Sequence, residues 1–132
     1  MKIPVKVRYG LRMMVLLAKS KKRTSTKKLS RIMNVSNLFL RQVAGPLEKK
    51  GFIKSFRGKQ GGYIMAKDPE KIKTFSVFKA FNQDLTLSHC VARPETCKKV
   101  KTCHTRKFIE NLSKIIEDKL KTTTLKDIMK MK

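Results

Sequence analysis

Apolar residues recur at helical spacing three times in the first fifty residues, and basic residues fill most of the other angles. The first series predicts a helix over residues 5–18 and comprises Val5, Tyr9, Met13, Leu16 and Leu17. The second series predicts a short helix whose inner face is Leu29, Ile32 and Met33. The third predicts a helix lined by Leu40, Val43 and Leu47. Three amphipathic helices with short connections therefore open the chain.

Polar residues and glycine mark the ends of these helices. Thr26 is expected to cap the second helix, and Asn34 suits the left-handed conformation that ends it. Ser36 can cap the third helix, which Gly51 closes. Pro46 lies inside the third helix and removes one backbone hydrogen bond, so we expect a local kink there. The apolar register extends past this proline, so the helix is expected to continue.

Residues 52–66 change to the pattern of a β-hairpin. Two short apolar segments, 52–56 and 63–66, flank a glycine-rich basic turn. A helix, a helix–turn–helix and then a basic hairpin is the element order of a winged helix-turn-helix DNA-binding domain. We therefore predict a mainly α fold with a small β-hairpin wing, and a winged helix-turn-helix domain over residues 1–67.

The second half, residues 68–132, reads as a separate region that begins at the Asp68–Pro69 turn. Thr74 is expected to cap a short helix, and residues 106–121 predict a long one that carries an apolar stripe. The stripe consists of Phe108, Leu112, Ile115, Ile116 and Leu120. Few helices remain to cover it, so we expect a long C-terminal dimerisation helix and a homodimer. Burial in the chain's own core is the alternative.

The strong positive charge of the chain indicates what class of partner it binds. The chain has 132 residues, with 33 Lys and Arg against 9 Asp and Glu, and a formal net charge of +24. Such a surface favours a polyanion, and double-stranded DNA is the first candidate. Glu48 is the single acidic residue between Lys2 and Lys67. A protein that coats nucleic acid by charge alone is an alternative.

The apolar runs of the chain are too short for a membrane span or a signal peptide. No run approaches the ~20 residues that a membrane span needs, so we expect no membrane partner. The short apolar run after the basic N-terminus belongs to an amphipathic pattern and does not indicate a signal peptide, so a cytoplasmic location is expected.

Candidate DNA contacts fall in two places. Those at the exposed start of the third helix are Ser36, Asn37, Arg41 and Gln42. Arg and Gln side chains suit the edges of guanine and adenine. Those on the wing are Arg57, Lys59 and Gln60, which are more suited to phosphate or the minor groove. A helical lobe that binds no DNA is the alternative, and the charge disfavours it.

Catalysis has little support in this sequence. It shows no paired-carboxylate arrangement, no strand–loop–helix context for its glycines and no persuasive Ser/His/Asp spacing. We therefore predict that the protein is not an enzyme.

All three cysteines, Cys90, Cys97 and Cys103, lie in one short polar and basic segment. Polar neighbours argue against three core thiols, and an odd number of cysteines fits a reducing compartment. Structural zinc prefers cysteine pairs two to four residues apart, which neither spacing matches. Iron–sulfur ligation tolerates wider spacing. A fourth ligand could come from the nearby acids and histidines or from a partner subunit: His89, Glu95, His104 and Glu110.

Several segments together resemble Rrf2-type transcriptional regulators. They are Lys6–Arg12, the Ser36-x3-Leu40-x-Gln42 and Pro46-Leu47 motifs, Lys50–Ser55, Arg57-Gly58-x2-Gly61-Gly62-Tyr63 and the three-cysteine segment. The resemblance covers essentially the whole chain, through the Thr124–Ile128 end. It is strongest to the iron–sulfur-responsive IscR-like and NsrR-like branches.

The resemblance implies a homodimeric winged-helix repressor or activator. In those branches three cysteines of the loop ligate a 2Fe–2S or 4Fe–4S cluster, and the state of the cluster changes DNA affinity or site choice. Cys90, Cys97 and Cys103 match these ligands, and Arg57 matches a wing arginine that enters the minor groove. The long helix matches the dimerisation helix of the family.

This chain departs from the family pattern at four places. The first cysteine spacing is one residue longer than usual. Arg106 occupies the IscR-like position of a histidine ligand, while His104 directly follows Cys103, and Arg8 stands where NsrR-like members have an aspartate ligand. Arg41 replaces a recognition-helix glutamate. A cluster-free member that responds through thiol redox chemistry or a partner protein is therefore an alternative.

Overall fold

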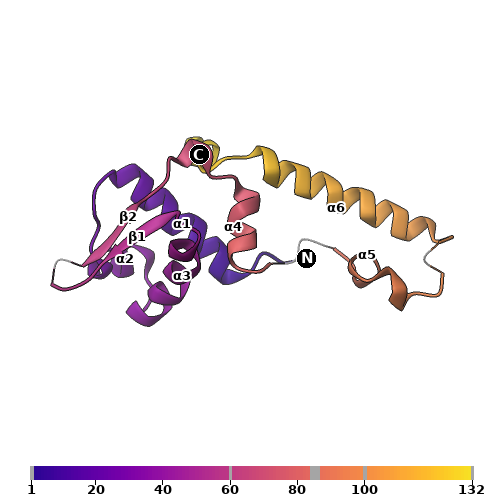
Figure 1. Cartoon of the computed structure of the whole chain (residues 1–132), viewed down its shortest axis with the longest axis horizontal. Helices are drawn as coiled ribbons and strands as arrows, with labels where there is room; N and C mark the ends of the chain where they lie inside the picture. The colour runs from indigo at the N-terminus through magenta and orange to yellow at the C-terminus, as the bar shows by residue number, and fades with distance from the viewer. Residues whose placement is uncertain (1, 60, 84–86, 100, 132) are drawn as a thin grey trace.

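The chain is mainly helical, with a two-stranded antiparallel hairpin, in the computed structural model (Figure 1). The structure describes residues 2–59, 61–83, 87–99 and 101–131. The side chains of His89 and Cys90 also lie outside the described part. The elements are α1 (Val5–Ser20), α2 (Thr26–Met33), α3 (Asn37–Lys49), β1 (Ile53–Phe56), β2 (Gly62–Met65), η1 (Pro69–Lys71), α4 (Thr74–Ala80), α5 (His89–Ala92), η2 (Pro94–Thr96), α6 (His104–Thr122) and α7 (Leu125–Lys130). The predicted fold class is confirmed.

Side-chain caps fix the start of both helices of the helix–turn–helix. The Ser36 hydroxyl accepts from the Phe39 N–H at 3.1 Å, as predicted for α3. For α2 the predicted cap was wrong by one residue. Ser25 caps this helix by accepting from the Lys28 N–H at 3.1 Å, and Thr26 is its first helical residue.

The predicted ends of these helices are confirmed. Asn34 has a φ of 53° and ends α2 in the left-handed conformation. Helix α3 continues through Pro46 to Lys49, because Leu47 is fully buried and the Pro46 carbonyl accepts from the Lys50 N–H at 3.2 Å. Gly51, with a φ of 77°, follows the end of α3.

The main apolar core lies where α1, α2, α3 and the hairpin meet. Met13, Met14 and Leu17 of α1 are fully buried in it. Leu29 and Met33 supply the buried face of α2, but Ile32 is 53% exposed, so its predicted place in the inner face was wrong. The inward stripe of this eight-residue helix is narrow, and Ile32 lies beside it.

The hairpin is attached to the helices through the segment between α1 and α2. Strand β1 pairs with β2 in the register Ile53↔Met65 to Phe56↔Gly62. Thr24 then pairs with Tyr63, since each backbone N–H donates to the other's carbonyl at 2.9 Å. At Gly62, whose φ is +149°, an added Cβ would lie 2.2 Å from the Thr24 carbonyl oxygen. Glycine is therefore required where the wing approaches this segment.

The chain returns to the same core after the hairpin. Ile72, Val77 and Leu125 are all buried there, although they lie in the second half of the sequence. The Leu125 N–H donates to the Ile72 carbonyl, and the Thr74 N–H donates to the Thr123 carbonyl, both at 2.9 Å. The predicted capping role of Thr74 was wrong. Its hydroxyl instead donates to the Leu120 carbonyl at 2.7 Å, in the last turn of α6.

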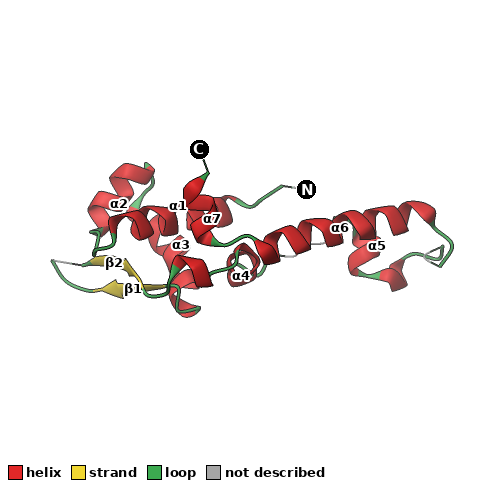
Figure 2. Ribbon diagram, turned by 90° about the horizontal axis from the view of Figure 1, so that it is seen from above, coloured by secondary structure: helices red, strands yellow, loops and turns green. Residues whose placement is uncertain are grey.

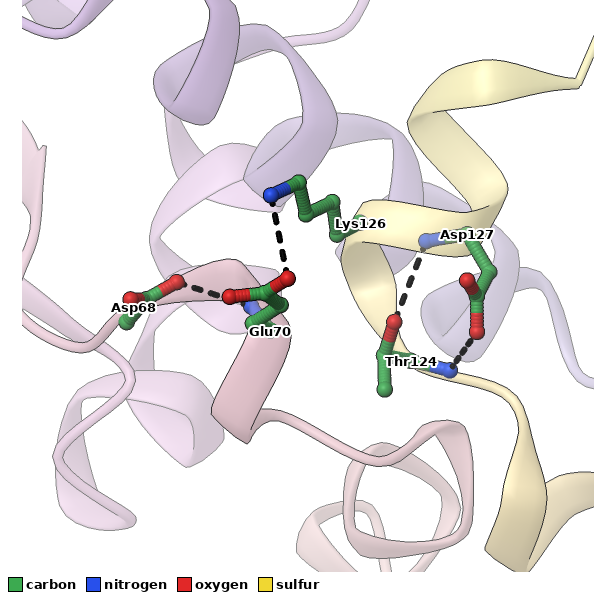
Figure 3. Close-up of polar contacts among 5 residues, drawn as sticks. All are labelled: Asp68, Glu70, Thr124, Lys126 and Asp127. Atoms are coloured by element: carbon green, nitrogen blue, oxygen red, sulfur yellow. Dashed lines mark hydrogen bonds and ion pairs between the residues drawn. The ribbon is translucent and has the colours of Figure 1, made fainter.

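Polar contacts hold α7 beside η1 (Figure 3). Thr124 and Asp127 form a reciprocal capping box at the start of α7. These hydrogen bonds lower the pKa of the Asp127 carboxyl. Lys126 Nζ lies 3.1 Å from Glu70 Oε1, and the Glu70 N–H donates to Asp68 Oδ1 at 2.9 Å. The end of the chain is thus fixed beside the turn that follows the hairpin.

Helix α6 extends away from this body (Figures 1 and 2). Its 19 residues span about 28 Å at the usual rise. The wing lies at one end of the molecule and the N-terminal end of α6 lies at the other, with α5 beside it. The Leu87 N–H donates to Ser113 Oγ at 3.4 Å, which joins the segment before α5 to the middle of α6. In the described part of the chain, no helix is both long and apolar enough to cross a bilayer.

Substitution of Gly62 tests the attachment of the wing. Gly62→Ala should lower the free energy of unfolding by more than 2 kcal/mol, because it adds a steric clash with the Thr24 backbone to the cost of a positive φ. Gly58→Ala is the matched control, since Gly58 has a φ of +93° but open space around it. It should cost about 1–2 kcal/mol. Urea unfolding measures both, and equal losses would contradict this account.

Candidate nucleic-acid interface and cysteine segment

The start of α3 presents polar side chains to solvent. Leu40, Val43 and Leu47 anchor one face of the helix in the core. The opposite face leaves all four predicted contact residues of α3 exposed: Ser36, Asn37, Arg41 and Gln42. Leu38, which no sequence pattern indicated as a surface residue, is 66% exposed on the same helix.

A groove of about 520 Å³ separates α3 from the wing. The described residues that line it are Thr26, Arg41, Ser55, Phe56, Arg57, Gly58, Gly61 and Tyr63. Arg41 of α3 and Arg57 of the wing line this one groove, although they were predicted as two separate groups of contacts. Arg57 and Lys59 are both exposed, and the predicted contact Gln60 lies outside the described residues. Thr26, Ser55 and Tyr63 also line the groove, although no sequence pattern indicated them as contacts.

The one acidic residue of this half is held at the edge of α3. Ser55 Oγ donates to Glu48 Oε1 at 2.6 Å. Burial and, to a smaller extent, the charge of Glu48 raise the pKa of Tyr63 above its usual 10.0, while Arg41 opposes this. The phenol is therefore protonated at neutral pH and can donate a hydrogen bond. Glu48, Arg41 and Tyr63 thus lie within electrostatic reach of one another.

Cations also stack on the aromatic residue at the base of the wing. The Arg23 guanidinium carbon lies 4.7 Å from the centroid of the Phe56 ring, and Lys54 Nζ lies 5.5 Å from the same ring. Positive charge from the α1–α2 segment and from β1 is therefore held beside the groove.

The cysteine segment ends at the distal end of α6. Cys103 is the N-cap of α6, and its Sγ accepts from the Arg106 N–H at 3.3 Å. Cys97 follows η2 and is half-buried, like Cys103. The backbone of Cys90 lies in α5, but its side chain is outside the described part. Among the described side chains, no three of His, Cys, Asp or Glu form a group that could hold a metal ion.

The candidate fourth ligands differ in their surroundings. His104 is exposed at the first position of α6. Arg106 Nη1 lies 3.3 Å from Glu110 Oε2, so these two side chains form an ion pair along the helix. Glu95 is exposed in η2, and the side chain of His89 is outside the described part.

Residues 3–131 match the family model Rrf2, described as "Iron-dependent Transcriptional regulator". The chain belongs to the Rrf2 family. It is 30% identical over 130 residues to the HTH-type transcriptional regulator CymR of Bacillus subtilis (strain 168), covering 97% of this chain and 89% of that protein.

Solved structures of the family agree with this assignment. The structure of B. subtilis CymR, titled the global cysteine regulator, has a TM-score of 0.80 at 29% identity and covers 98% of this chain and 96% of that one. The structure of T. potens IscR has a TM-score of 0.74 at 30% identity and covers 98% and 87% of the two chains. The predictions of an Rrf2 transcriptional regulator that is not an enzyme are confirmed.

The apolar stripe of α6 is divided in this Rrf2 chain. At its C-terminal end, Leu120 packs against the small cluster of Val7 and Phe78. Toward the distal end, Phe108 is 66% and Ile115 is 65% exposed. Within α6, which is described throughout, Ser113 is the only buried residue. The chain's own core therefore covers only the proximal part of the stripe.

Substitutions at Cys103 separate its capping role from its thiol chemistry. Cys103→Ser should keep or slightly increase the free energy of unfolding, because a hydroxyl is a strong N-cap acceptor. Cys103→Ala should lose about 0.5–1 kcal/mol because the Arg106 N–H loses its acceptor. Thermal unfolding without metal measures both variants. An alanine variant as stable as the serine variant would contradict the capping role.

Proposed function

We propose that this Rrf2 protein is a homodimeric, sequence-specific regulator that binds double-stranded DNA with α3 and the wing, and that its cysteine segment modulates binding. The observation that carries the DNA-binding part of this proposal is the groove between α3 and the wing, which Arg41 and Arg57 both line. The nearby carboxylate of Glu48 accepts a hydrogen bond from Ser55. Regulators of this family bind DNA. Because its target is the chromosome, we place the protein in the cytoplasm.

The contacts divide by residue type. We assign Arg41 and Gln42 to base edges, because α3 presents them outward beside the wing. Asn37 lies in the same exposed first turn of α3. The Ser36 hydroxyl caps α3 by accepting from the Phe39 N–H, so we assign Ser36 the role of orienting the start of α3. We assign Arg57, Lys59 and Gln60 to phosphates or the minor groove.

A second copy is the cover that we propose for the distal face of α6. Its exposed apolar residues, Phe108, Leu112 and Ile115, lie on a helix that extends beyond the core. Isologous pairing would bury the same residues twice and present two α3 helices, as required to read two half-sites. Ile116 would continue this interface toward the body, and Leu120 would mark its end, because Leu120 packs against the chain's own cluster of Val7 and Phe78.

A paired substitution tests the dimer. Phe108→Ser/Ile115→Ser should reduce the mass in light scattering from twice 15.2 kDa to 15.2 kDa, because the apolar contact is lost. Lys107→Ser/Lys114→Ser is the control, since both lysines are exposed on the same helix but outside the stripe. A wild-type chain that is monomeric at micromolar concentration would overturn this part.

For the cysteine segment we propose that Cys90, Cys97 and Cys103 hold a 2Fe–2S or 4Fe–4S cluster, with His104 a candidate fourth ligand. The donor set fits this group, because soft cysteine thiolates are the ligands that iron–sulfur clusters take in proteins. The Arg106 N–H at the start of α6 donates to Cys103 Sγ at 3.3 Å, which fixes the position of that sulfur. When bound, the cluster would supply redox- or iron-dependent binding chemistry at the distal end of α6.

A second candidate is a cluster-free regulator that responds through thiol oxidation or a partner protein. The specific observation in its favour is the similarity to CymR, which is named as the global cysteine regulator. In addition, Arg106, which is ion-paired with Glu110, occupies the position where IscR-like relatives have a histidine ligand. A protein that coats nucleic acid by charge alone is the third candidate.

Selection from a random duplex library separates regulation from coating. We expect one sequence to be enriched. Arg41→Ala should relax preference at one base pair by about 1–3 kcal/mol. Arg57→Ala should weaken binding to all sequences and reduce the salt slope by about 0.9. Lys126→Ala is the control, since Lys126 lies in α7, away from the groove. A library without enrichment, bound with a steep salt slope, would favour the coating protein.

Anaerobic purification tests the cluster. We expect a coloured protein that contains iron and sulfide in stoichiometric amounts. The triple Cys→Ser variant should lose the colour, the iron and the sulfide, and its DNA affinity should no longer depend on iron. A colourless, iron-free protein whose DNA binding does not change after reconstitution, but does change with oxidants, would support the cluster-free candidate instead.

A further inference from the structure

An exposed leucine lies in the first turn of α3. Leu38 is 66% exposed and belongs to neither apolar cluster of the described part of the chain. The turn that carries it is fixed on two sides. Phe39 packs edge-on against Tyr9 of α1, with the ring centroids 5.4 Å apart, and the Ser36 hydroxyl caps the helix. Leu38 is therefore held in solvent by an ordered turn.

The position of Leu38 distinguishes it from other exposed apolar residues. Single apolar side chains are common on protein surfaces and by themselves indicate no function. Leu38, however, precedes Arg41 and Gln42 by three and four residues, so the three side chains lie on one face of α3. The proposed function assigns Arg41 and Gln42 to base edges. The face directed at the bases thus has one apolar group beside two polar ones.

The chemistry of the major groove identifies a partner for this apolar group. Thymine is the base that presents a methyl group there, attached at C5 beside its O4 acceptor. The Leu38 side chain has neither a donor nor an acceptor, so it cannot pair with the polar groups of the base edges. Contact with the methyl group would remove apolar surface of both partners from water, which is favourable.

We propose that Leu38 recognises a thymine by packing against its C5 methyl group, beside the bases that Arg41 and Gln42 contact. The proposal rests on the proposed function, because it names one base of the sequence that α3 reads. In a homodimer, each half-site would contain one such thymine. Because the contact is uncharged, it contributes to sequence preference and not to the salt dependence of binding.

Deoxyuridine tests this contact, because it lacks the methyl group of thymine but pairs with adenine in the same way. Each thymine of the duplex enriched by selection is replaced singly, and the affinity of the full chain is measured. One replacement per half-site should weaken wild-type binding about fourfold, the loss expected for one buried methyl group. Leu38→Ala should bind the original and the substituted duplex equally, with the wild-type salt slope.

The matched control is Ile32→Ala. Ile32 is also an exposed apolar residue, at 53%, but it lies on α2. This variant should keep the wild-type preference for thymine over deoxyuridine. Both variants should melt at the wild-type temperature, because neither side chain belongs to the buried core.

Two results would overturn the thymine contact alone. One is a wild-type affinity that no deoxyuridine replacement changes. The other is a thymine that is as sensitive in Leu38→Ala as in wild type, since another residue would then contact the methyl group. Failure of the selection to enrich any sequence would overturn the proposed function, and the thymine contact with it.

Discussion

The backbone pairing of Thr24 with Tyr63 is the interaction on which the DNA-binding surface depends. It joins the α1–α2 segment to β2, and it is compatible only with glycine at position 62. Because the wing is held there, Arg57 lies across a groove from Arg41. The surface is therefore a product of tertiary structure, in which a recognition helix and a hairpin are held at a fixed separation.

A second set of contacts connects this surface to the cysteine segment. The segment lies at the distal end of α6, far along the molecule from the wing (Figures 1 and 2). The proximal end of α6 is tied to α4 through the Thr74 hydroxyl, and the following residues return to the core through Leu125. Helix α6 is thus the one continuous element between the thiols and the DNA-binding core in the described chain. A change at Cys103 would act through the orientation of this helix and through any partner that covers it.

Periodicity predicted the elements well because their burial patterns are local. The series of apolar residues located α1, α3 and the hairpin, and the continuation of α3 through Pro46 followed from the burial of Leu47. Ends were less accurate where two hydroxyl residues compete, as with Ser25 and Thr26. Thr74 looked like a cap because its partner, the Leu120 carbonyl, lies 46 residues away in sequence. The place of Tyr63 in the groove could not be predicted from the sequence, because it depends on the pairing of β2 with Thr24, which lies far away in the chain.

The DNA-binding surface can be tested most directly by a structure of the chain bound to its enriched duplex. We predict that α3 lies in the major groove and that Arg57 lies at the backbone or in the minor groove. A duplex that lies instead along α6 or α7, away from α3 and the wing, would contradict this prediction.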